Sequence, residues 1–161
     1  MAVVAVTASN PTKFNQVSFV IDYDQPNPLH FTCATRKLSH TVSQAFEDVE
    51  TLCNPGGEAP GKVTQSLDVE LLYEHSTTGA YNQLYTLVGT SHSFAILLRG
   101  TGAVSASNPE WSGKLWIPQV PIMDGQAING YMKIPLVFKI NGLITTKVSG
   151  SPVYAGHTVP A

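Results

Sequence analysis

The chain has few charged residues: they make up 12% of its 161 residues, against about a quarter in an average globular domain. Nine Lys and Arg against eleven Asp and Glu leave a net charge of −2. The chain therefore lacks the basic surplus of a nucleic-acid binder and the large net charge of a disordered protein. Because a soluble monomer usually covers itself with mixed charges, we expect neighbouring subunits to cover much of this surface.

Long apolar runs and export signals are also missing. The first seven residues have no cationic region, so we expect no signal peptide and a protein made and kept inside the cell. No run reaches the roughly 18 apolar residues of a membrane helix, so we expect no membrane contact. Cys33 and Cys53 are too few and too far apart for a zinc knuckle or a redox pair; we expect two free thiols, with a disulfide as the less favoured alternative.

The dominant pattern that is present is alternation of apolar and polar residues with a period of two, which predicts half-buried strands. Residues 17–33, interrupted by the turn-forming 24–28, are typical of a β-hairpin. Further strands are predicted at 67–73, 94–98, 115–117 and 132–140.

Turn residues suggest how two of these strands continue. Asn141-Gly142 favours a type I′ turn, which needs positive φ at both central residues, so a last strand over 143–148 should fold back on its predecessor. Pro118 and Pro135 lie inside strand patterns, which predicts edge strands or bulges there, because proline has no N–H to donate.

One helix is predicted at about residues 79–88, with hydroxyl residues before it as caps and Gly89 after it. Residues 39–52 fit either a helix or a strand, and we favour strand and loop. The Pro- and Gly-rich stretch 54–61 predicts irregular structure, so we expect a long loop at about residues 38–62.

The elements together predict a single all-β domain with one flanking helix, an antiparallel β-sandwich or barrel. We expect an N-terminal segment over residues 1–13, the domain over 14–148, and a flexible C-terminal tail over 149–161 that is rich in Ser, Gly and Pro.

Residues that could carry catalysis or bind a metal are scattered. The five histidines never occur at ligand spacing, so we expect no metal and no cofactor. Ser91-His92-Ser93 lacks the turn that exposes a nucleophile, and Asp22 and Asp24 are interpreted as turn residues. We therefore expect no catalytic residues and no enzyme.

One charge pattern remains. Asp68, Glu70 and Glu74 share a strand face opposite the apolar positions of 67–73, which places an acidic stripe on one side of the domain. A solvated outer face is the simpler interpretation of such a stripe; a functional one depends on what lies opposite.

The order of several segments resembles the major tail tube proteins of long-tailed, siphovirus-like bacteriophages. The likeness covers about residues 14 to 150. The segments that carry it are Leu29–Thr35, Leu52–Gly57, the acidic strand, Leu84–Gly89, Ser105–Gly113 and Leu115–Pro118.

The resemblance implies a β-sandwich or barrel subunit that assembles into hexameric rings, which stack into the virion tail tube. It implies the other tail proteins, such as the tape measure and tail terminator, as partners, and DNA that passes through the lumen without specific binding. Dense Lys or Arg would retain the DNA, since each neutralised phosphate adds affinity. Asp68, Glu70 and Glu74 then become candidate lumen-facing residues.

Two other hypotheses remain open. In a β-sandwich binding or virion decoration module, which would bind carbohydrate or a capsid, Trp111 and Trp116 would form one exposed apolar platform. An enzyme of unknown chemistry is the third, because irregular sites can escape motif analysis.

Overall fold

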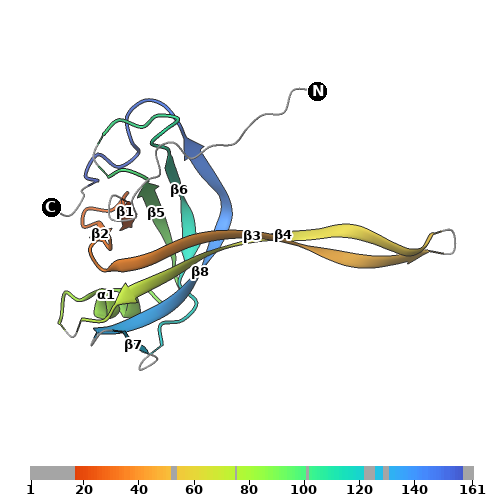
Figure 1. Ribbon diagram of the computed structural model, residues 1–161, viewed down its shortest axis with the longest axis horizontal. Coiled ribbons are helices and arrows are strands. Elements are labelled where there is room, and N and C mark those ends of the chain that lie inside the picture. Colours follow the sequence, from red (N-terminus) through yellow and green to blue (C-terminus); the bar gives the residue numbers. More distant parts are fainter. Residues whose placement is uncertain are drawn as a thin grey trace.

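The computed structural model describes residues 17–51, 54–74, 76–100, 102–121, 126–128 and 131–157. Within them it contains eight strands and one helix, and Figure 1 shows a body from which one long hairpin projects. The elements are β1 (Ser18–Ile21), β2 (Leu29–His30), β3 (Thr35–Thr51), β4 (Asn54–Leu72), α1 (Ala80–Thr86), β5 (Ser91–Leu97), β6 (Glu110–Trp116), β7 (Gln126–Ile128) and β8 (Tyr131–Lys147).

The strands form one antiparallel sheet in the order β2-β1-β5-β6-β8-β4-β3, with β7 paired to β8. The two ends of this order, β2 and β3, are consecutive in the chain and are joined by residues 31–34. So short a link keeps the two ends close, and Leu72 in β4 donates its N–H to the carbonyl of Ala34 in the link (2.8 Å). The sheet therefore curls into an open barrel, which confirms the predicted all-β class with one helix.

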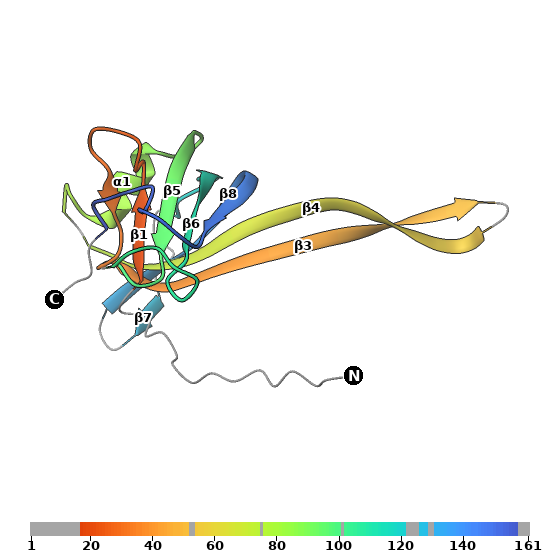
Figure 2. The same ribbon diagram turned by 90° about the horizontal axis from the view of Figure 1, so that it is seen from above.

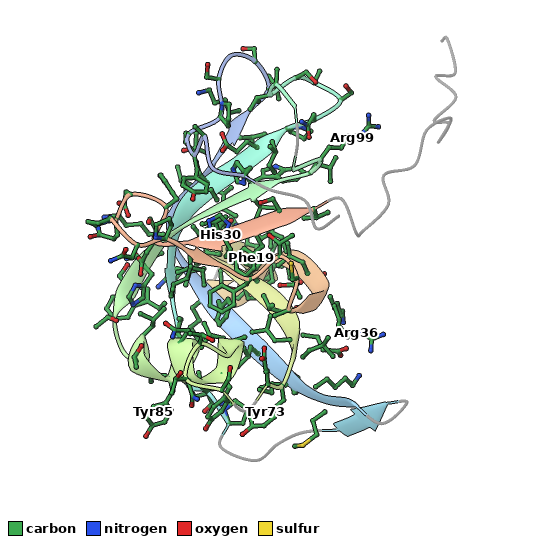
Figure 3. All side chains as sticks on the ribbon, turned by 90° about the vertical axis from the view of Figure 1, so that its left-hand side faces the viewer. Phe19, His30, Arg36, Tyr73, Tyr85 and Arg99 are labelled. Carbon is green, nitrogen blue, oxygen red and sulfur yellow. The ribbon has the colours of Figure 1, made fainter. Side chains whose placement is uncertain are left out.

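The core lies inside this curl, where Figure 3 shows Phe19 among the strands. Phe94 and Phe138 are fully buried, and α1 contributes Leu84. The strands expected at 67–73, 94–98 and 132–140 are confirmed; the buried residues of β4 and β8 alternate along the strand, whereas β5 is buried on both faces over Ser93–Leu97. Each large apolar side chain buried in this way contributes about 1.5–3 kcal/mol.

The long loop expected at about residues 38–62 is wrong. β3 and β4 pair with each other over nearly their whole length and project from the body as a two-stranded hairpin (Figure 2). Each strand of such a ribbon pairs on one edge only, so a proline N–H missing from residues 54–61 breaks no hydrogen bond to a second neighbouring strand. The register shifts between β3 and β4 accommodate the proline and glycine residues that do not fit a regular ladder. Cys53 lies outside the described residues, so its pairing with Cys33 stays untested; Cys33 itself is exposed.

The hairpin expected at Asn141-Gly142 is also wrong. β8 continues through both residues, and the positive φ of Gly142 (+87°) belongs to a bulge where β8 gains residues relative to β6. β8 as one strand pairs with β4 over residues 133–139 and with β6 over 139–147, and the bulge lies within the second stretch. Pro135 pairs with Glu70 in β4, in a stretch where β6 has no register partner, so the missing N–H faces a local edge.

The predicted helix is present as α1, with Leu87 at its C-terminus. The hydroxyl caps expected before it are not used, since Gly79 is the N-cap and makes no side-chain cap bond. The side-chain amides of Asn82 and Gln83 instead donate to the carbonyls of Ser76 and Thr77 and hold the preceding turn.

The flexible tail expected from residue 149 is instead a packed segment over residues 150–157, which has no helix or strand but contacts the body through Val153 and His157. Sequence composition indicated flexibility because the segment is poor in apolar residues; its contacts are polar and lie on distant strands. Residues 1–16 and 158–161 lie outside the described part of the chain. No helix of the described residues is long and apolar enough to span a bilayer.

Candidate assembly surfaces

The outer part of the β3–β4 hairpin, residues 42–51 and 54–65, pairs only with itself, and we call it the arm. Among the side chains of the arm that the structure describes, three large apolar ones are exposed: Val42 (57% exposed), Phe46 (64%) and Val63 (49%). Val42 and Phe46 alternate on one side of β3, and Val63 lies on the same side of β4 because it pairs with Gln44. The three apolar side chains therefore lie on one face of the arm, which also carries Gln44 and Gln65 and which we call the apolar face.

The opposite face of the arm is polar. The hydroxyls of Ser43 and Thr64 are hydrogen-bonded across the two strands (2.8 Å). A two-stranded ribbon has no core of its own and is at best marginally stable in water. Exposed apolar residues on one face of such a ribbon are typical of a surface that another molecule covers.

The predicted acidic residues lie partly where they were expected. Asp68 and Glu70 are half-buried on the outer face of β4, and their neighbours Leu67, Val69 and Leu71 are buried on the inner face. Glu74 is exposed, but it follows the end of β4 at Leu72 and does not share the strand face.

The face around the two carboxylates is not an acidic stripe. Lys133 of β8 forms an ion pair with Glu70 (Nζ to Oε2, 2.9 Å). Lys37 of β3 is the cross-strand partner of Glu70. Lys139 lies on the same side of β8, opposite Ser66 of β4. In the folded protein this face of the sheet therefore carries lysines beside the carboxylates, whereas the sequence of β4 alone suggested only negative charge.

The two tryptophans do not form one platform. Trp111 packs against the core cluster and lines an apolar cavity of about 430 Å³ at the end of the barrel from which the arm leaves. Trp116 is 42% exposed and pairs with Lys139 on the outer face. The bulge opposite β6 and the strand alternation place the two rings on opposite sides of the sheet.

His92 sits in a row of hydrogen-bonding groups that superficially resembles a catalytic triad. Its Nδ1 lies 2.9 Å from Asp22 Oδ2, and its Nε2 lies 2.6 Å from Thr90 Oγ1. Thr90 Oγ1 also hydrogen-bonds to the carbonyl oxygen of Leu87 (2.9 Å). The row therefore closes the turn after α1, and Asp22 is the turn residue that the sequence predicted, with φ of 56°.

Within the ranges that the structure describes, no three His, Cys, Asp or Glu side chains are grouped so that they could hold a metal ion. His75 lies outside those ranges. Sequence analysis missed one cluster, Glu110 with His157 and Ser18, because these residues are up to 139 positions apart in the chain.

The chain matches no protein-family model and no curated protein sequence. Solved structures do match it. The SPP1 tail tube is 16% identical with a TM-score of 0.59, covering 86% of this chain and 81% of that one. The tail of an empty gene transfer agent particle, with C6 symmetry, is 14% identical with a TM-score of 0.56, covering 86% and 100%. A chain from the virion of a native gene transfer agent particle is 15% identical with a TM-score of 0.55, covering 88% of this chain and 100% of that one.

Proposed function

We propose that this chain, whose fold is that of tail tube subunits of siphovirus-like bacteriophages, is a structural protein of the virion tail that assembles into stacked hexameric rings. The observation that carries the proposal is the combination of that fold with an arm whose apolar face is exposed in the single subunit. The role is structural and not enzymatic, and the tube conducts the genome during ejection.

Several features of the molecule support self-association. Among the described strands, β2 and β3 end the sheet order and have no further neighbouring strand, and such edges are a hazard in a monomer and a means of assembly in a ring. The arm reaches beyond the body that it belongs to (Figure 1), so its apolar face has to be covered by another subunit. A contact between two different surfaces of identical subunits produces rings or filaments.

The test is assembly of the purified protein. At rising protein concentration we expect light scattering to increase and negative-stain electron microscopy to show rings and tubes with sixfold symmetry. A monodisperse monomer under every assembly condition, with no ring or tube, would contradict the proposal.

We further propose that Asp68, Glu70 and Glu74 face the lumen. The support is their position on or beside the outer face of β4, away from the core. Because Glu70 is paired with Lys133, Glu70→Lys removes an ion pair as well as a negative charge, whereas Glu74→Lys changes an exposed residue alone.

Virions carrying Glu74→Lys or Glu70→Lys should form tails of normal length and eject DNA more slowly, because added cations retain phosphates. Glu74→Gln is the matched control, since it removes the charge without adding a cation, and it should behave nearly as the wild type. DNA ejection at the wild-type rate by both lysine variants would contradict the proposal that these residues face the lumen. It would not contradict the proposal that the chain forms the tube.

The proposed partners follow from the same role: other copies of this chain, the tape measure and terminator proteins of the tail, and DNA that passes without specific binding. Copurification of these proteins with assembled tubes from infected cells tests this part. The carbohydrate-binding alternative loses its support, because Trp111 and Trp116 lie on opposite sides of the sheet.

A further inference from the structure

The body has a second buried face, on the outer side of the sheet. Val20 and Ala95 are fully buried and Leu97 is 1% exposed, yet none of the three belongs to the core cluster inside the barrel. The register places them on the side opposite Phe19 and Ile96, which are core residues. Something on the outer side must therefore exclude water from β1 and β5.

Residues 150–157, which we call the strap, lie on this outer side, because the residues they contact share it with Val20 and Leu97. It begins just after β8, where Gly150 bridges to Val104. Its hydrogen-bonding partners lie on three strands: Glu110 on β6, Ser18 on β1 and His30 on β2. Figure 1 shows the chain approaching the C-terminus beside β1 and β2. The strap thus lies against β6, β1 and β2 on the outer side of the sheet.

Glu110 anchors the strap. Its side chain is fully buried, and it is the only charged residue among the buried residues of the described chain. It accepts the backbone N–H groups of Val153 (2.7 Å) and Tyr154 (3.5 Å) and a bond from His157 Nε2 (3.0 Å). A buried carboxylate is tolerated when donors surround it, and here every donor comes from the strap.

His157 completes the contact. Its side chain is 2% exposed, and its Nδ1 lies 2.9 Å from Ser18 Oγ. A neutral imidazole with its proton on Nε2 satisfies both neighbours, since Nε2–H donates to Glu110 while Nδ1 accepts the Ser18 hydroxyl proton. A second proton on Nδ1 would turn Ser18 Oγ from donor to acceptor and would place a full positive charge in a buried site.

We propose that the strap is a pH-sensitive latch, docked when His157 is neutral and released when His157 is protonated. The groups that face His157 come from every neighbouring element: Glu110 of β6, Ser18 of β1, His30 of β2, and Tyr154 of the strap itself, whose ring lies 5.3 Å from the imidazole. Tyr154 also bonds His30 through its hydroxyl (2.8 Å).

The balance of forces gives the direction of the switch. Burial lowers the pKa of His157 below its ordinary value of 6.5, and His30 lowers it further, whereas the hydrogen bond and the charge of Glu110 raise it without reversing the shift. A released strap returns His157 to water. The contribution of His157 to docking is therefore fully present above pH 6.5 and is lost as the pH falls below that value.

Amide hydrogen exchange of the full chain tests the latch, since the N–H groups of Val153 and Tyr154 point at Glu110. After correction for intrinsic exchange, we expect their protection to fall between about pH 8 and about pH 5, by up to roughly tenfold per pH unit, the limit for one linked proton. Amides of β5 should keep their protection, which separates strap release from global unfolding.

Two substitutions of the same residue sharpen the test. His157→Gln can donate to Glu110 and accept from Ser18 without titrating, so its strap should stay protected at both ends of the pH range. His157→Lys carries a permanent charge, so its strap should exchange rapidly at all pH values. His30→Gln is the control for the neighbouring imidazole and should keep the pH dependence.

The proposal is overturned if protection of Val153 and Tyr154 is constant or rises on acidification, which would mean that protonated His157 pairs more strongly with Glu110. It is also overturned if His157→Gln shows the pH dependence of the wild type. Neither result depends on whether the chain forms tubes.

Discussion

Gly142 shows how one residue directs a whole strand. Its φ of +87° lies in the left-handed region, and a side chain there would meet open space, so the restriction is conformational and not steric crowding. Gly142 lies in the bulge where β8 gains residues relative to β6, so its conformation lets β8 pair with β6 on both sides of the bulge. A residue that resists positive φ should therefore destabilise the body even though nothing touches it.

We predict that Gly142→Val lowers the free energy of unfolding by about 1–3 kcal/mol, because a β-branched residue is strained at positive φ. Gly142→Asn should be milder, since asparagine tolerates this region better than other residues. Urea denaturation followed by circular dichroism measures both. Equal stability of the valine variant and the wild type would show that β8 does not need this conformation.

At the scale of the element, the arm differs from every other pair of strands. Over residues 66–72, β4 pairs with β3 on one side and with β8 on the other. In the arm, each of the two strands pairs only with the other. Its apolar residues add nothing to the core of the subunit. Their energetic contribution must therefore appear on association, and a change there should separate assembly from folding.

We predict that Val42→Ser combined with Phe46→Ser prevents tube formation and leaves the melting temperature of the body nearly unchanged, because both side chains are exposed in the single subunit. Ser43→Ala combined with Thr64→Ala is the matched control, on the polar face of the same arm. Electron microscopy of assembly and thermal unfolding of the soluble forms of the wild type and the two variants measure these two effects. Tubes formed normally by the serine variant would show that the apolar face is not the contact.

At the scale of the whole molecule, the scarcity of charge sets the forces that are available for assembly. Charged residues make up 12% of the chain, and several of the acidic ones are already paired within the subunit, as Glu70 with Lys133 and Glu110 with His157. Contacts between copies must therefore depend mainly on apolar burial and on backbone pairing at strand edges.

Assembly should for this reason survive high salt. At about 1 M NaCl the Debye length is roughly 3 Å, which screens exposed ion pairs but not apolar contacts. We predict that light scattering of assembled protein stays constant or rises from low salt to about 1 M NaCl, and that sulfate promotes assembly further. Disassembly on adding NaCl would show that ion pairs between subunits dominate.

The spacing of apolar residues predicted those features of the fold that depend on residues close together in the chain. The alternation at 67–73 identified which side of β4 faces the core, because the period of two is a property of the strand itself. The helix at Ala80–Thr86 and the β1–β2 hairpin followed from spacing of the same local kind. The all-β class could be predicted from these elements together.

Only the tertiary structure decided the rest, because the deciding partners are far away in the chain. Gly142 demands positive φ in a turn and in a bulge alike, and pairing with β4 and β6 selects the bulge. Asp68 and Glu70 suggested an acidic stripe until lysines from β3 and β8 came to lie beside them. The polar strap looked flexible until folding brought a buried carboxylate on β6 within reach of its N–H groups, since hydrogen bonds of that range leave no periodic trace in the sequence.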